Sequence, residues 1–422
     1  MKFLANATKI SPARVAAFEI LTRVATSSDH SDDLLHGRRM AGLSQVDRNL
    51  ANALVLGVLR WEIALDARIK PLLQRPEMKL AQPIELALRL GAFQLLYMDR
   101  IPAHAALSES VELVRAAGQE HAAGMVNAVL RALTRQAPVR KPLFETTAAL
   151  AERLGHPAWL VERWVANYGR TTAVAICEYD QFLRSDDTVF TENFTVSAVM
   201  DDGSRLVAET AAVTVDSPKR IWDCCAAPGG KTLVLAIRHP EAEVLATDVS
   251  PRRLKALVER LERELPGREI RTLEADASAL PVEEGEFDLI LCDVPCSGTG
   301  TLARNPEIRH HLRPSDLGRQ VERQRALLSG ALKRLAPGGR LVYSTCSLEP
   351  EENERVVEAV LAEASGVGLV AVDSAVEKLR ERGAIDLGVD LAGCLRDGYL
   401  RTLPGANFQG DGFFAAVFER VL

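Results

Sequence analysis

The first 135 residues alternate apolar and polar positions with the period of amphipathic helices. Apolar side chains recur three and four positions apart, as in Val15, Phe18 and Leu21, and Ser11 followed by Pro12 fits the start of a helix. Because the helical stretches follow one another on short connections, this part of the chain is predicted to be an all-α bundle. The further helices expected in it span residues 46–61, 83–98, 104–115 and 124–134.

The pattern changes after Lys219 to short apolar runs that alternate with helical stretches. This alternation predicts a doubly wound, mostly parallel sheet, so we expect a Rossmann-like α/β domain after the bundle. The expected boundaries are 1–140 for the bundle, 141–215 for a linker and 216–422 for the α/β domain. The expected strands span residues 220–225, 243–247, 269–273, 287–291 and 340–343.

Composition narrows the class of protein. The 422 residues are 47% apolar and 26% charged, as in soluble globular proteins of two or three domains. No run of about 18 uncharged residues could span a bilayer, and the first residues lack the apolar core of a secretory signal, so we expect a cytoplasmic protein. Seven cysteines without paired spacing indicate free thiols, and we expect no metal site.

Charge is unevenly distributed along the chain. The net charge is −6, yet the first 140 residues hold 18 Lys and Arg against 13 Asp and Glu. A basic face would suit a nucleic-acid partner, and a solvated helical surface explains the same count equally well. Trp159 and Trp164 likewise suit either a helix core or a base-stacking platform, with the core favoured.

The small residues at 226–232, between an expected strand and a helix, predict a loop that a nucleotide-like ligand approaches closely. A phosphate-binding loop needs glycine where Cys225 stands, and the glycine spacing of a dinucleotide site is missing. The remaining ligand is a nucleoside without pyrophosphate, such as S-adenosylmethionine. Asp248 is then placed to hold ribose hydroxyls. Asp276 suits either the adenine or a helix N-cap.

Two thiols and a carboxylate follow the ends of two expected strands. Cys346 comes after 340–343, and Asp293 and Cys296 come after 287–291. Enzymes that methylate an exocyclic amine place an aromatic residue where Cys296 stands, which favours covalent chemistry on a ring carbon. C5 of a pyrimidine becomes nucleophilic when a thiolate adds to C6. Asp293 could hydrogen-bond the base and stabilise that adduct.

Residues 223–232, 293–300 and 343–354 resemble the Nol1/Nop2/Sun family of RNA cytosine-C5 methyltransferases. The resemblance implies that Cys346 is the nucleophile and that Cys296 assists product release. It also implies small-subunit (16S) ribosomal RNA as substrate; a transfer RNA, or a binding protein with a vestigial site, is the alternative. The cofactor-binding residues that it implies are Cys225, Ala226, Ala227, Pro228, Gly229, Gly230, Lys231, Asp248, Asp276 and Asp293.

Residues 47–61, 90–97 and 127–131 look like the NusB-type RNA-binding domain, which implies that the bundle binds RNA. Family members usually carry a longer segment where this chain has only residues 181–198, so the RNA-contacting region is shortened. Arg304, Arg309 and Arg313 belong to a basic stretch after Cys296; a solvated face is possible, and we favour contacts with RNA phosphates. We expect a monomer.

Overall fold

The computed structural model describes residues 10–27, 29–136, 144–181, 190–191, 200–386 and 389–421. The chain forms two compact units. The first comprises Met1–Leu183 and Leu302–His311, and the second comprises Arg184–Thr301 and Leu312–Leu422. The shortened segment 181–198 falls mostly outside the described residues.

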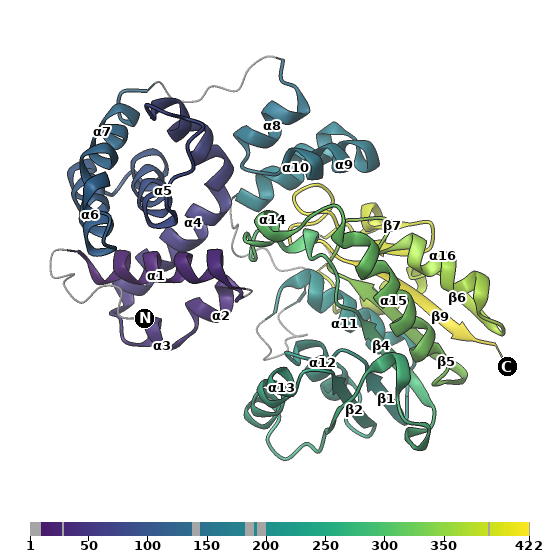
Figure 1. Cartoon of the computed structure of the whole chain (residues 1–422). Coiled ribbons are helices and arrows are strands. Elements are labelled where there is room, and N and C mark those ends of the chain that lie inside the picture. Colours follow the sequence, from purple (N-terminus) through teal and green to yellow (C-terminus); the bar gives the residue numbers. More distant parts are fainter. Residues whose placement is uncertain are drawn as a thin grey trace. The chain divides into compact units, whose positions relative to one another are not determined.

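The first unit is helical, as the apolar spacing predicted (Figure 1). Its principal helices pack in sequence order, α1 on α4, α4 on α5, α5 on α6 and α6 on α7. Ser11 starts α1, and its backbone N–H and hydroxyl both donate to Glu109, which lies on α6. The helices are α1 (Pro12–Thr26), α2 (Ser31–Leu35), α3 (Arg38–Ala41), α4 (Gln45–Ile69), α5 (Gln82–Tyr97), α6 (Ala103–Ala116) and α7 (Ala123–Leu133).

This unit continues beyond residue 140, the expected end of the bundle. Three more helices belong to it, α8 (Thr147–Arg153), α9 (Ala158–Tyr168) and α10 (Arg170–Gln181), and so does the short α14 (Ile308–His311). Trp164 is fully buried on α9 beside His156, so its expected place in a helix core is confirmed. Burial lowers the pKa of His156 to about 4, which leaves a neutral ring that interacts with the buried Asp180.

The second unit is built on a nine-stranded sheet in the described residues, with the order β3-β2-β1-β4-β5-β9-β8-β7 and β6 paired to β9. The first five strands are parallel, which confirms the predicted doubly wound arrangement. The antiparallel strands that follow were not predicted. The strands are β1 (Arg220–Asp223), β2 (Glu243–Asp248), β3 (Arg271–Glu274), β4 (Phe287–Asp293), β5 (Leu335–Thr345), β6 (Val367–Val370), β7 (Leu395–Arg396), β8 (Tyr399–Arg401) and β9 (Phe414–Arg420).

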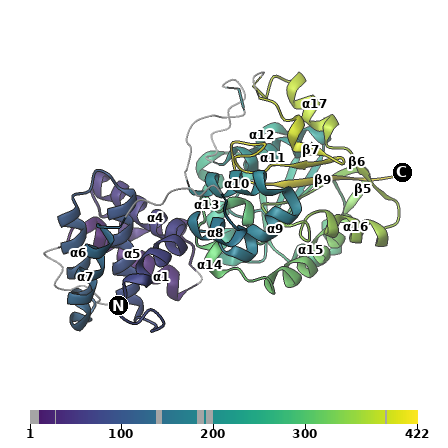
Figure 2. The ribbon, with the colours of Figure 1, turned by 90° about the horizontal axis from the view of Figure 1, so that it is seen from above.

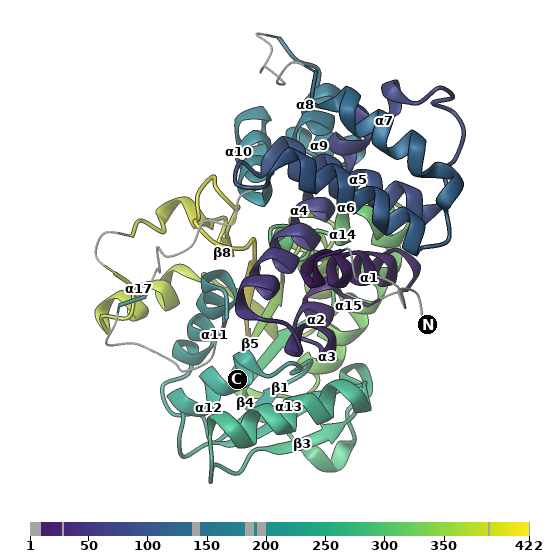
Figure 3. The same ribbon diagram turned by 90° about the vertical axis from the view of Figure 1, so that its left-hand side faces the viewer.

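Helices cover both faces of this sheet (Figure 2). Alternate strand residues point to opposite sides, so Leu289 and Leu291 join one core and Ile290 the other. The first core includes residues of α11 (Asp202–Thr214), α12 (Gly230–Arg238) and α17 (Asp373–Glu381). The second includes residues of α15 (Asp316–Leu332) and α16 (Glu354–Glu363). Helix α13 (Pro251–Glu264) lies against β2 and β3 (Figure 3).

None of the helices in the described part of the chain is long and apolar enough to cross a membrane.

Candidate active site

The carboxyl ends of the parallel strands gather the residues that the sequence singled out. Asp248 is the last residue of β2, and Asp293 is the last residue of β4. Asp293 pairs in register with Ser344 of β5, so the loops that follow these two strands start side by side. Ligands of open α/β sheets bind at this edge. The sequence-predicted cysteines and carboxylates therefore share one edge of the second unit.

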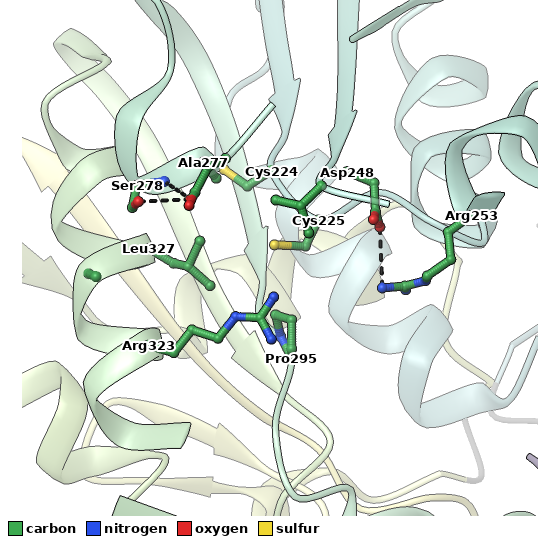
Figure 4. Close-up of a pocket in the computed structure, with 12 residues that line it drawn as sticks. Cys224, Cys225, Asp248, Arg253, Ala277, Ser278, Pro295, Arg323 and Leu327 are labelled. Atoms are coloured by element: carbon green, nitrogen blue, oxygen red, sulfur yellow. Dashed lines mark hydrogen bonds and ion pairs between the residues drawn. The ribbon is translucent and has the colours of Figure 1, made fainter. Parts of the chain in front are cut away.

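A cavity of about 160 Å³ lies at this edge (Figure 4). Asp248 is 3% exposed; its carboxylate accepts a hydrogen bond from the backbone N–H of Ser250 and lies 3.3 Å from an Nη of Arg253. Asp276 accepts from the N–H and hydroxyl of Ser278, so it caps a 3₁₀ turn while it lines the cavity. An acidic residue at the end of β2 is in a position that suits ribose hydroxyls.

The glycine turn beside this cavity depends on its residue types. Gly229 has a φ of +96°, and a Cβ there would come within 2.4 Å of the Leu257 side chain. The left-handed backbone conformation therefore favours glycine, and a Cβ would also have to displace the end of the Leu257 side chain. Of the predicted cofactor-binding residues, Cys225, Asp248 and Asp276 line the cavity. The others, Ala226, Ala227, Pro228, Gly229, Gly230, Lys231 and Asp293, are not among its lining residues.

Sequence reasoning did not single out Arg323 as part of this cavity. It lies on α15 and lines the cavity together with Pro295, the residue before Cys296 (Figure 4). The helical spacing of the basic stretch carries no information about which arginine reaches the ends of the strands. The cavity thus extends from Asp248 to the backbone that carries the first thiol.

The two predicted catalytic thiols are adjacent. The sulfur atoms of Cys296 and Cys346 lie 3.3 Å apart, and both residues are half-buried free cysteines. The hydrogen bond with Cys346 raises the pKa of Cys296 well above its usual range, and burial adds to the effect. The backbone N–H of Gly300 donates to the carbonyl of Cys346 at 2.9 Å, which joins the two loops. Cys296 is therefore held as a neutral thiol beside its partner.

Asp293 is held by two neighbours. Its Oδ2 lies 2.8 Å from Nζ of Lys231, and its Oδ1 accepts a 2.7 Å hydrogen bond from the Ser344 hydroxyl. Burial alone would lower the pKa of Lys231, and the carboxylate of Asp293 outweighs it, so the pKa is raised. Lys231, which the sequence assigned to the cofactor, thus forms an ion pair with the predicted catalytic carboxylate.

A second carboxyl group, that of Asp223, interacts electrostatically with Asp293 and Lys231. Asp223 ends β1 and is 1% exposed, and the Thr232 hydroxyl donates to it at 2.7 Å. Burial raises its pKa to about 7, although the bond from Thr232 opposes the shift. Asp223 therefore links β1 to α12 and can hold a proton near neutral pH.

Glu352 is a site residue for which the sequence suggested no role. It stands between β5 and α16, is fully buried, and accepts hydrogen bonds from Ser297 and Ser347. In the sequence, Glu352 is one of several acidic residues in 349–354. Nothing in local spacing indicates which of those side chains points inward, because the partners come from another loop.

The three predicted substrate-binding arginines have different surroundings. Arg304 and Arg313 are exposed, as contact with RNA requires. Arg309 is 1% exposed within the first unit, where its guanidinium donates to the backbone carbonyls of Arg60, Gly155 and Leu302. A guanidinium that is enclosed and bonded to carbonyls cannot reach a phosphate, so the prediction for Arg309 is corrected to a structural role.

Known proteins share both parts of this chain. The family model described as "16S rRNA methyltransferase RsmB/F" matches residues 211–419, and the NusB family model matches residues 11–135. The "Probable ribosomal RNA small subunit methyltransferase B" of Bacillus subtilis (strain 168) is 31% identical over 453 aligned residues, which cover 96% of this chain and 98% of that protein. The "Ribosomal RNA small subunit methyltransferase B" of Xanthomonas campestris is 32% identical, with 88% of both chains covered.

Solved structures agree on the fold. The crystal structure of PH0851 is 22% identical, covers 97% of this chain and 99% of that chain, and superposes with a TM-score of 0.74. Fold, site and relatives together define an RNA methyltransferase whose cofactor is S-adenosylmethionine. The chain belongs to the RsmB/F family of 16S rRNA methyltransferases and carries a NusB domain at its N-terminal end. The predicted family, fold class and cofactor are thereby confirmed.

Proposed function

We propose that this protein methylates C5 of a cytosine in 16S ribosomal RNA through a covalent adduct between Cys346 and C6. The observation that carries the proposal is the 3.3 Å separation of the Cys296 and Cys346 sulfurs at the carboxyl ends of β4 and β5. A single nucleophile would need one thiol. Two adjacent thiols suit a reaction in which one forms a bond to the base and the other assists its cleavage.

The proposed reaction balances as follows. The Cys346 thiolate forms a bond to C6 while the C5=C6 double bond opens, which makes C5 nucleophilic. When bound, S-adenosylmethionine would supply the electrophilic methyl group that C5 takes up, and S-adenosylhomocysteine would be the leaving group. In the proposal Cys296 takes up the C5 proton while it gives its own proton to the departing sulfur of Cys346, and the electron pair of the C5–H bond restores the double bond as the bond between sulfur and C6 breaks. The free thiol of Cys346 is then regenerated.

Asp293 and Lys231 support the ring during these steps. In the proposal their ion pair, 2.8 Å long, faces the edge of the cytosine, where a fixed charge pair can hydrogen-bond the base and stabilise charge in the adduct. The hydroxyl of Ser344 holds the other oxygen of Asp293 in place. Groups fixed before the base arrives need no reorganisation at the moment of reaction, so they contribute to the rate.

The substrate class rests on the relatives and on the NusB domain. The matched proteins from Bacillus subtilis and Xanthomonas campestris are named as ribosomal RNA small subunit methyltransferases. We propose that the helical unit binds the same RNA, that exposed Arg304 and Arg313 contact phosphates, and that the protein acts in the cytoplasm as a monomer. A transfer RNA substrate is the alternative within the same chemistry.

Mass spectrometry of RNA fragments tests this function. The purified protein is incubated with S-adenosylmethionine and unmethylated 16S ribosomal RNA or transfer RNA, and each RNA is digested and searched for a 14 Da increase on cytosine. We expect 5-methylcytosine at one position of the ribosomal RNA only. Modification of transfer RNA alone would favour the transfer RNA alternative. Absence of modification in both RNAs would favour a binding protein with a vestigial site.

A further inference from the structure

The side chain of Glu352 bonds to the residue that follows each thiol. Ser297 comes directly after Cys296, and Ser347 directly after Cys346. The backbone N–H of Ser297 donates to Oε1 of Glu352 at 2.9 Å, and the Ser347 hydroxyl donates to Oε2 at 2.5 Å. The Ser297 hydroxyl also donates to Oε2, and the two hydroxyl oxygens lie 3.0 Å apart. One carboxylate therefore joins the two cysteine loops.

The backbone of the Cys296 loop is fixed on both sides of the thiol. Nε2 of Gln324, on α15, lies 2.9 Å from Oε1 of Glu352 and 3.0 Å from the carbonyl oxygen of Pro295. The peptide before Cys296 is thus held by Gln324, and the peptide after it by Glu352. Four donors surround a carboxylate that is 0% exposed, which satisfies a group that can only accept when ionised.

We propose that Glu352 is a positioning residue that holds the Cys296 and Cys346 loops together, so that both thiols face the same base. Its significance for catalysis rests on the function proposed above, whereas the alignment of the thiols can be measured without RNA. Glu352 touches neither sulfur through a hydrogen bond in the structure, so it acts through the serines next to them.

The charge of Glu352 fits this role. The bond with Cys346 and burial raise the pKa of Cys296 most, and the negative charge of Glu352 adds to them. A carboxylate at this place thus both holds the loop and favours the neutral form of the second thiol. Glutamine would keep the size of the side chain, but its NH₂ group would face hydrogen-bond donors, and the charge would be gone.

The probe for alignment is dibromobimane, a short reagent that becomes fluorescent when it links two thiols. We expect fast linking in the wild type, none in Cys346→Ala, and linking at least about tenfold slower in Glu352→Gln. The matched control is Glu363→Gln, which removes an exposed carboxylate that pairs with Arg325 on the surface, and it should behave as the wild type.

Turnover distinguishes positioning from mere folding. A displacement of about 1 Å at reacting groups can cost about 100-fold in rate, so Glu352→Gln should lower kcat by about that factor. Its affinity for S-adenosylmethionine and its KM for RNA should stay within about twofold of the wild type. A structural role alone would instead lower the melting temperature and leave kcat of the folded fraction unchanged. If Glu352→Gln does not fold, Ser297→Ala with Ser347→Ala removes both hydroxyl bonds and keeps the carboxylate, and it should also slow linking.

Linking at the wild-type rate in a folded Glu352→Gln protein would overturn the proposal, as would lost linking with full kcat. Should the wild type methylate no cytosine while its linking depends on Glu352, the proposed function fails and the positioning role stands.

Discussion

The Cys296 and Cys346 sulfurs lie 3.3 Å apart although 50 residues separate them in the chain. The parallel register of β4 and β5 produces this proximity, because it sets Asp293 opposite Ser344 and so starts both loops at the same level. The bond with Cys346 and burial raise the pKa of Cys296, which suits the proton-handling role that we propose for it.

Cofactor affinity should depend on Asp248. Its carboxylate is almost fully buried at the cavity, and charge-assisted hydrogen bonds contribute about 1.5 to 3 kcal/mol. Asp248→Ala should therefore weaken S-adenosylmethionine binding by about tenfold or more in calorimetry. Asp373→Ala, an exposed aspartate on α17, is the control and should bind as the wild type. Equal affinities for S-adenosylmethionine in the two variants would contradict the assignment of Asp248 to the ribose hydroxyls.

Asp223 should make stability depend on pH. Its pKa rises from 3.8 to about 7 on folding because it is buried, so the folded state binds its proton more tightly than the unfolded state. This contribution is fully present below about pH 4 and is lost as the pH rises through 7, by at most about 4 kcal/mol.

Asp223→Asn keeps an acceptor for Thr232 and removes the titration. Denaturation curves between pH 4 and 7 should show a decline in the wild type that is smaller in Asp223→Asn, whereas exposed Asp373→Asn should follow the wild type. Identical pH profiles of all three proteins would contradict the buried, raised pKa of Asp223.

The corrected role of Arg309 predicts a loss of stability. Arg309→Ala would leave the carbonyl of Gly155 without this donor, at about 1 to 3 kcal/mol, whereas the carbonyl of Arg60 keeps the side chain of Gln181 as a donor. We expect the first unfolding transition in urea to lose about 1 to 3 kcal/mol. A change below about 0.5 kcal/mol, the usual effect at a surface position, would show that Arg309 is not buried in this way.

Arg313 should show the opposite behaviour. It is exposed in the second unit, so Arg313→Ala should change stability by less than about 0.5 kcal/mol. If it contacts a phosphate, the slope of log affinity for RNA against log salt should fall by about 0.7. Arg396→Ala removes an exposed arginine next to Asp397 and serves as the control. An unchanged salt slope of RNA affinity in Arg313→Ala would show that Arg313 does not contact a phosphate.

Features that depend on local sequence could be predicted, whereas features that depend on contacts between distant segments could not. Asp248, Asp293 and Cys346 could be placed at one edge of the sheet because each ends or follows a strand, and parallel strands present those ends at one edge; their roles in cofactor binding and catalysis stay predictions. Helices α1, α4, α5, α6 and α7 of the first unit were predicted for a similar reason, since apolar periodicity is local. Nothing beyond the order of the residues is needed in either case.

The remaining features depend on contacts between distant segments. Arg309 looked like its exposed neighbours, because a charge pattern does not show which side chain is enclosed by α4 and the loop after α8. Glu352 could not be distinguished from Glu351 without the loop that carries Ser297. Residues 414–418, which form part of β9, are apolar throughout. A short apolar run of this kind is compatible both with a buried strand and with a segment of a buried helix, so the antiparallel strands could not be predicted from it.

The most direct test of the central claim is a denaturing gel of each cysteine variant mixed with 16S ribosomal RNA and S-adenosylmethionine. Cys296→Ala should still add to the base and transfer the methyl group, then stall as a slowly migrating protein–RNA band, because acid–base assistance worth about 10²- to 10⁴-fold is missing. Cys346→Ala should form no band and no 5-methylcytosine. A band with Cys346→Ala that is absent with Cys296→Ala would reverse the two roles, and near-normal turnover of Cys296→Ala without a band would contradict the two-thiol reaction.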